Sequence, residues 1–172
     1  MFGFLKKKKN KIKKDRFQRY LNLVDNNNFG HTPVQRAKIL IKIIVEHLNY
    51  QEALQAFEKE YDVQDNSLIE EIYSKIESCL DLKRRTILIE KELIKIDINK
   101  LPILLNPWSG ERILGNFINI NDNNVFDGVC YSYNIQNHYL YPMNIVVCKG
   151  GNHSQLSARY QNKGETVINE IK

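Results

Sequence analysis

Apolar residues recur at helical spacing through the first half of the chain. The segment "RFQRYLNLV" places four of them on one helical face: Phe17, Tyr20, Leu21 and Val24. The polar segment "DNNNFG" that follows favours a turn, so the first predicted helix ends before it. Thr32 and Pro33 then suit the N-cap and the first position of a second helix.

The second helix, "VQRAKILIKIIVEHL", is predicted to lie deep in the core. Five apolar residues form one stripe and three more widen it: Ala37, Leu40, Ile41, Ile44 and Leu48, with Ile39, Ile43 and Val45. A third helix is expected over "QEALQAFEKEY", with Leu54, Phe57 and Tyr61 on one face. A fourth is expected to open at a Ser-x-x-Glu capping box at residues 67–70 and to bury Cys79 as a small core residue.

The pattern changes near residue 93, where apolar and polar residues alternate. Ile94, Ile96 and Ile98 alternate with polar neighbours, which is typical of a strand with one face in water. A short apolar run follows at residues 103–105, and "SGERILGNFINI" suits a short helix. The segment "VFDGVCYSYNIQNHYLYPMNIVVC" favours strands, with a hairpin turn expected at Gln136 and Asn137.

These patterns together predict an α+β protein. The expected parts are a disordered basic tail over residues 1–14, a helical region over residues 15–92 and a small mixed α/β domain over residues 93–172. The three cysteines fit neither a disulfide framework nor a paired zinc motif, so a reducing cytoplasm is the expected compartment.

Positive charge is concentrated at the start of the chain. Residues 1–19 hold nine Lys or Arg against one Asp, a net charge of +8, so the other 153 residues sum to −3. The apolar residues of "MFGFLKKKKNKIKK" precede its lysines, unlike those of a secretory signal. Three interpretations stay open for this basic segment: a solvated arm, binding to nucleic-acid phosphates, or binding to an anionic membrane surface.

The clearest candidate site lies near the end of the chain. A predicted strand over residues 145–148 leads into two glycines, and a helix is expected to start near His153. Backbone N–H groups at a helix N-terminus attract anions, and glycines let a phosphate approach closely. Five consecutive residues therefore form a candidate phosphate cradle: Gly150, Gly151, Asn152, His153 and Ser154.

The segment "VVCKGGNHSQLSARYQNKGETVINEI" resembles the nucleotide-binding segment of the ParB/sulfiredoxin-like superfamily. Upstream, "INKLPILLNPWSGER" is similar to the entry segment of ParB, with Asn106, Pro107 and Arg112 at the corresponding places. The resemblance covers roughly residues 93–172 and implies a mixed α/β domain that binds a nucleotide. The chain is also similar to bacterial proteins with Asn-Pro-Trp and Gly-Asn-His-Ser boxes.

Two departures from that family narrow the expected chemistry. Asn152 stands where sulfiredoxin has its nucleophilic cysteine, which disfavours reductase activity. Ser154 stands where an arginine would hold phosphate, so the cation is expected from Arg112 or Lys149. The expected ligand is a nucleoside triphosphate, accompanied by Mg²⁺. If it is hydrolysed, His153 or Glu111 is expected to position water.

Three alternatives accompany this prediction. The first is a non-enzymatic adaptor that binds nucleic acid, an anionic membrane or a partner protein through its basic tail and helical region. The second is a zinc site built from His138, Cys148 and His153, although these residues lack paired spacing. The third is a metal-dependent nuclease, from the Glu-x-Lys pattern of residues 170–172, for which no acidic partner is evident.

Overall fold

The computed structural model describes residues 15–28, 30–58, 68–80, 87–88, 94–120, 125–126 and 134–172. The predicted tail over residues 1–14, the capping residue Ser67 and the predicted boundary at 92/93 lie outside these ranges. The chain divides into two compact units, one ending at Ile43 and the other starting at Ile44. The α+β class with a helical N-terminal region is confirmed.

The first unit contains a helix over residues 15–25 and the start of α2 (Pro33–Glu58). Thr32 and Gln35 form the capping box that opens α2: the Gln35 N–H donates to Thr32 Oγ1 at 3.3 Å, and the Thr32 N–H donates to Gln35 Oε1 at 2.9 Å. The predicted start of this helix is therefore confirmed. Its predicted deep burial is wrong, because Ile39 and Ile43 are 52% and 60% exposed.

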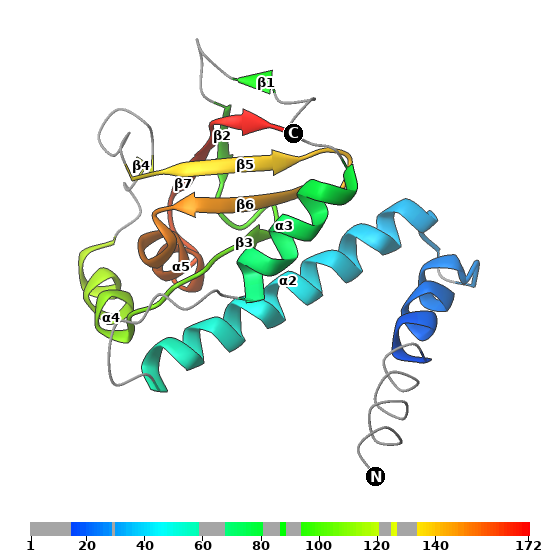
Figure 1. Cartoon of the computed structure of the whole chain (residues 1–172), viewed down its shortest axis with the longest axis horizontal. Coiled ribbons are helices and arrows are strands. Elements are labelled where there is room, and N and C mark those ends of the chain that lie inside the picture. Colours follow the sequence, from blue (N-terminus) through cyan, green and yellow to red (C-terminus); the bar gives the residue numbers. More distant parts are fainter. Residues whose placement is uncertain are drawn as a thin grey trace. The chain divides into compact units, whose positions relative to one another are not determined.

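The second unit is built on two mixed sheets (Figure 1). The five-stranded sheet has the order β1-β8-β5-β6-β3, and the three-stranded sheet has the order β2-β7-β4. The strands are β1 (Ile87–Leu88), β2 (Ile94–Asp97), β3 (Ile103–Leu104), β4 (Val125–Phe126), β5 (Gln136–Leu140), β6 (Ile145–Gly150), β7 (Glu165–Ile168) and β8 (Glu170–Ile171). The helices α3 (Leu68–Leu80), α4 (Gly110–Asn119) and α5 (Asn152–Tyr160) complete the unit with the rest of α2.

The core of this unit gathers around β6 and α5. β6 buries Ile145 to Cys148 consecutively because both faces of this interior strand are covered, as is usual where a sheet lies between helices. α5 buries seven of its nine residues, including Arg159, whose Nε donates to Glu46 Oε2 at 3.2 Å. α5 is therefore a central helix, fixed by packing and by a buried ion pair.

The second half of α2 corrects one prediction. Residues 51–58 continue α2 without a break, so no separate third helix exists in this segment. The face that carries Leu54 and Phe57 is exposed, whereas Ala53 and Ala56 are buried. Tyr61 lies outside the described residues. The small alanines allow close approach of the helix to the core, which the larger residues would prevent.

Two further predictions are wrong in this unit. Cys79 is exposed on α3 rather than buried in the core. Gln136 and Asn137 belong to β5, and the chain reverses direction at residues 141–144 instead. Asn137 is fully buried because its side chain has hydrogen-bond partners from distant parts of the sequence, which a local pattern does not reveal. Within the described residues, no helix has the length and apolarity needed to cross a membrane.

Candidate functional site

The Gly150–Gly151 turn between β6 and α5 is tightly enclosed. A Cβ on Gly150 would lie 2.3 Å from the backbone oxygen of Asn134, and one on Gly151 would lie 2.4 Å from Ile135 Cδ1. Gly151 also has φ +78°, a left-handed conformation that side chains disfavour. Glycine is therefore required at position 150 for space, and at position 151 for both space and backbone conformation.

A buried amide network holds this turn against the sheet. Gln155 Nε2 donates to the Gly150 carbonyl at 3.1 Å, and Asn137 Nδ2 donates to Gln155 Oε1 at the same distance. The Thr166 hydroxyl donates to Gln155 Oε1 at 2.6 Å, which connects the network to β7. Because these groups satisfy one another inside the protein, the start of α5 has a fixed position relative to the strands.

Asn152 and His153 fasten α5 to the loop that precedes α4. Asn152 Oδ1 accepts the Asn106 N–H at 2.8 Å, and His153 Nε2 accepts the N–H groups of Trp108 and Ser109 at 3.1 Å each. The intervening Pro107 has no N–H to satisfy. Two side chains of α5 thus accept every backbone N–H of residues 106–109.

This geometry determines the tautomer of His153. Its Nε2 accepts two hydrogen bonds, so that nitrogen carries no proton and the neutral ring holds its proton on Nδ1. The ring also meets the Trp108 indole edge-on, with ring centroids 4.1 Å apart. His153 is therefore a structural acceptor at Nε2, and that nitrogen is not available as a general base.

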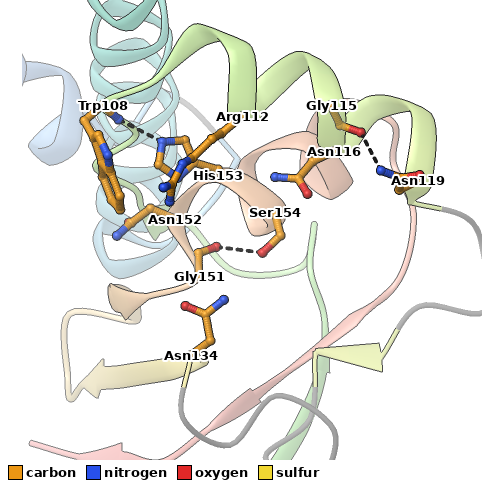
Figure 2. A pocket seen from close by; sticks show the side chains of 10 residues that line it. All are labelled: Trp108, Arg112, Gly115, Asn116, Asn119, Asn134, Gly151, Asn152, His153 and Ser154. Atoms are coloured by element: carbon orange, nitrogen blue, oxygen red, sulfur yellow. Dashed lines mark hydrogen bonds between the residues drawn. The ribbon is translucent and has the colours of Figure 1, made fainter. Parts of the chain in front are cut away.

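The start of α5 opens onto a cleft of about 410 Å³ (Figure 2). The cleft is lined by residues from the α4 entry, from α4 itself, from Asn134 and from the first turn of α5: Trp108, Arg112, Gly115, Asn116, Asn119, Asn134, Gly151, Asn152, His153 and Ser154. No carboxylate belongs to this lining set. The cleft therefore presents amides, one guanidinium and the positive end of a helix, a composition that suits an anion.

Several hydrogen-bond donors of the cleft have no acceptor among the described residues. Asn152 is only 8% exposed, yet its Nδ2 has no such partner. The orientation of this amide is fixed because Oδ1 must face the Asn106 N–H. The Arg112 guanidinium has no ion-pair partner in this part of the chain and lies 5.6 Å from the Trp108 ring centroid.

The two helices at the cleft differ in their caps. Ser109 caps α4, with its Oγ accepting the Arg112 N–H at 3.4 Å. Gly151 begins α5 and supplies no side-chain acceptor for the N–H groups of the first turn. The Ser154 hydroxyl donates back to the Gly151 carbonyl at 3.1 Å. The first turn of α5 therefore lacks the acceptor that a Ser or Asp cap would supply.

The structure brings together five of the predicted site residues. Gly151, Asn152, His153, Ser154 and Arg112 all line the cleft.

The other four predicted residues lie outside the lining set. Gly150 forms the wall behind the turn, and Asn106 contributes its backbone N–H to Asn152. Glu111 is exposed on α4. Lys149 places Nζ 3.8 Å from the Tyr73 ring centroid, on the face of β6 opposite to Cys148, because neighbouring strand residues alternate. The structure therefore does not bring Lys149 to the cleft.

Sequence reasoning missed the polar face of α4. Gly115, Asn116 and Asn119 follow Arg112 at spacings of three, four and seven, which places all four on one side of a helix. That spacing was a usable signal. Asn134 gave no such signal, since it reaches the cleft only because β5 pairs with β6.

The cleft residues offer little to a metal ion. No group of three or more His, Cys, Asp or Glu residues is placed to hold a metal among the described residues. The described residues of the cleft supply no carboxylate for Mg²⁺, so they do not fit a protein-held magnesium ion. Burial raises the pKa of Cys148 to about 12, and its Sγ contacts Gln155 at 3.1 Å. The thiol is therefore protonated. Strand alternation also directs His138 to the face of the sheet opposite to Cys148, so these two residues of the predicted zinc site do not meet.

Comparison with known proteins identifies the family of this chain. No curated protein matches the sequence, and no solved structure does. The resemblance to ParB and sulfiredoxin stays a prediction. A family model described as "Family of unknown function (DUF6710)" matches residues 3–172, so the chain belongs to the DUF6710 family.

Proposed function

We propose that this protein binds a phosphate-bearing ligand, a nucleoside triphosphate in the first instance, in the cleft between α4 and α5. The observation that carries the proposal is the Asn152 side chain. It is nine-tenths buried, its oxygen is already engaged, and its Nδ2 donor lacks an acceptor within the described residues. Because Asn152 lines the cleft, an anionic ligand oxygen there would accept a hydrogen bond from this donor.

The surroundings of Asn152 support an anion in particular. The uncapped first turn of α5 provides backbone N–H groups and a partial positive charge. The Arg112 guanidinium provides a full charge and a planar pair of donors that matches phosphate. The amides of Asn116 and Asn134 line the same cleft and suit the sugar or base of a nucleotide.

The proposal concerns binding rather than turnover. His153 Nε2 is occupied by two backbone N–H groups, and Glu111 lies outside the lining set. Neither residue therefore supports the predicted positioning of a hydrolytic water. Mg²⁺ enters this proposal only together with the ligand phosphates, which would supply its oxygen ligands.

The sharpest test replaces Asn152 by Asp. Asp keeps the oxygen that accepts the Asn106 N–H and replaces the amide donor with a negative oxygen. A carboxylate in the first turn also stabilises a helix, by about 0.3–1 kcal/mol. Asn152→Asp is therefore expected to keep the fold while its affinity for phosphate falls about tenfold or more.

Binding is measured by calorimetry with ATP, GTP, CTP, UTP and inorganic pyrophosphate, with and without Mg²⁺. Arg112→Gln and Lys149→Gln form a matched pair, because both remove one cation and only Arg112 lines the cleft. Arg112→Gln should weaken binding about tenfold, and Lys149→Gln should change it little. Equal losses in the two variants, or unchanged binding in Asn152→Asp, would refute the proposed site.

A further inference from the structure

The described part of the first unit contains a pair of helices connected by hydrogen bonds of one arginine. Arg36 Nε donates to the Val24 carbonyl at 2.6 Å, and its Nη1 donates to the His31 carbonyl. These contacts satisfy backbone oxygens at the end of the helix over residues 15–25 and in the following turn. Arg36 is itself buried, so these hydrogen bonds are largely shielded from water.

An apolar groove of about 280 Å³ runs between these two helices. It is lined by Leu23, Val24, His31, Arg36, Ile39, Leu40 and Ile43, and we call this surface the groove face. Three of its large apolar side chains are more than half exposed: Leu23 at 51%, Ile39 at 52% and Ile43 at 60%. Exposed apolar surface of this kind, gathered around a groove, is typical of a binding surface.

The charge of this part of the chain narrows the choice of partner. Residues 1–43 hold twelve Lys or Arg and two Asp, a net charge of +10, whereas the remaining residues sum to −5. Lys38 and Lys42 are exposed one helical turn apart, each directly preceding an isoleucine of the groove face. A second copy of so basic a unit would be repelled, which argues against self-association through this surface.

An anionic membrane surface matches both the positive charge and the exposed apolar side chains of the groove face. Nucleic-acid phosphates would attract the lysines but gain nothing from Leu23, Ile39 and Ile43. A bilayer with anionic lipids attracts lysines to its headgroups and accepts apolar side chains just below them. We propose that the groove face docks on an anionic lipid surface, with Ile39 and Ile43 inserted and Lys38 and Lys42 among the headgroups.

The test is co-sedimentation of the full chain with vesicles of phosphatidylcholine containing 30% phosphatidylserine, against pure phosphatidylcholine, at about 0.15 M salt. The full chain is expected to bind only the anionic vesicles. Lys38→Ala/Lys42→Ala should lower the partition coefficient about 25-fold, since each lysine near an anionic surface contributes about fivefold. Ile39→Ser/Ile43→Ser should lower it about tenfold or more.

Matched controls lie in the second unit. Leu114→Ser/Ile118→Ser removes two exposed apolar side chains of α4 that do not line the cleft, and Lys95→Ala/Lys100→Ala removes two exposed lysines. Both control pairs are expected to bind vesicles as the parent does. Circular dichroism of every variant establishes that it remains folded.

Four results would overturn the proposal. They are no binding to anionic vesicles, equal binding to both lipid mixtures, equal losses in the control pairs, or an isoleucine variant that binds like the parent. Unchanged binding by the isoleucine variant would mean that the lysines alone bind the anionic vesicles. A single-stranded oligonucleotide bound equally by the parent and the isoleucine variant, without vesicle binding, would assign the surface to nucleic acid instead.

Discussion

The two faces of the five-stranded sheet carry two polar clusters of opposite character. On one face, Asn137 and Cys148 point towards α5 and the cleft lies beyond them. On the other face, His138 and Lys149 point towards α3. The first cluster is made of neutral polar groups, whereas the second combines His138 and Tyr73 with charged side chains. The contrast lies in where their polar groups find partners.

The α3 cluster satisfies itself. His138 Nδ1 contacts the Tyr73 hydroxyl at 3.1 Å, and its Nε2 lies 3.5 Å from Glu170. Lys172 Nζ lies 3.4 Å from Glu170 and 3.5 Å from Glu77. Every group named here has an internal partner, so the cluster explains how α3 is held on the sheet and requires no ligand.

The cleft differs because its donors face open volume. Asn152 Nδ2 and the Arg112 guanidinium have no acceptor within the described residues, and the cleft beside them measures about 410 Å³. Titratable groups alone are thus a poor guide to a binding site in this protein. The better guide is a fixed donor whose acceptor is missing.

The largest expected effect comes from blocking the turn at the cleft. Gly151→Val should destabilise the protein by roughly 3 kcal/mol, because valine disfavours φ +78° and its Cβ would overlap Ile135. The measurement is the free energy of unfolding in urea. Gly115→Ala is the matched control on the same cleft: nothing lies within 4 Å of the added methyl, so a gain of about 0.5–1 kcal/mol is expected. A Gly151→Val protein as stable as the parent would contradict the described turn.

The two histidines provide the next test of the comparison. His153→Ala leaves the N–H groups of Trp108 and Ser109 without their acceptor, so a loss of about 2–4 kcal/mol is expected. His138→Ala should cost less, since Glu170 keeps Lys172 as a partner. Urea denaturation of both variants measures the difference. The reverse order of stabilities would mean that the α3 cluster, and not the cleft, depends on its histidine.

A smaller effect is expected from one hydroxyl of the α3 cluster. Tyr73→Phe removes the contact with His138 Nδ1 and should cost about 1 kcal/mol. Tyr141→Phe removes a hydroxyl from a side chain that is 67% exposed and should change stability little. The melting temperatures of the two variants, compared with that of the parent, check this order. Identical melting temperatures for all three proteins would show that the Tyr73 hydroxyl contributes nothing.

The smallest expected effect is a pH dependence confined to the α3 cluster. Burial lowers the pKa of His138 below its ordinary value of 6.5, and Glu170 opposes this only in part. The unfolded chain therefore takes up the proton first as the pH falls through about 6.5, and the contribution of neutral His138 to stability is lost below that value. The parent should lose more stability than His138→Gln between pH 7.5 and 5.5. Parallel stability curves for the two proteins would argue against a depressed pKa.

Local patterns predicted most elements of the fold but not what covers them. The alternation at residues 94–98 and the apolar run at 145–148 correctly predicted β2 and β6. The wide apolar stripe of α2 predicts burial, yet Ile39 and Ile43 are exposed. Periodicity shows which residues share a face, whereas burial depends on whether another element packs against it.

The candidate site was predictable in part for a similar reason. Gly151 to Ser154 lie together in sequence, so their grouping followed from the turn itself. Lys149 was misplaced because its side chain leaves β6 on the face opposite to Cys148, a consequence of strand alternation that the prediction overlooked. Asn134 joins the cleft through strand pairing, which depends on contacts distant in sequence.

The hydrogen bonds from Asn152 and His153 to residues 106–109 have a thermodynamic consequence. They join the entry of α4 to the entry of α5, so Arg112 and the first turn of α5 keep their spacing in the absence of any bound molecule. A receptor whose contact groups are already ordered loses little conformational entropy when it is occupied, and more of the gross interaction appears as affinity. For the proposed ligand, the joined entries of α4 and α5 would therefore lower the entropic cost of binding.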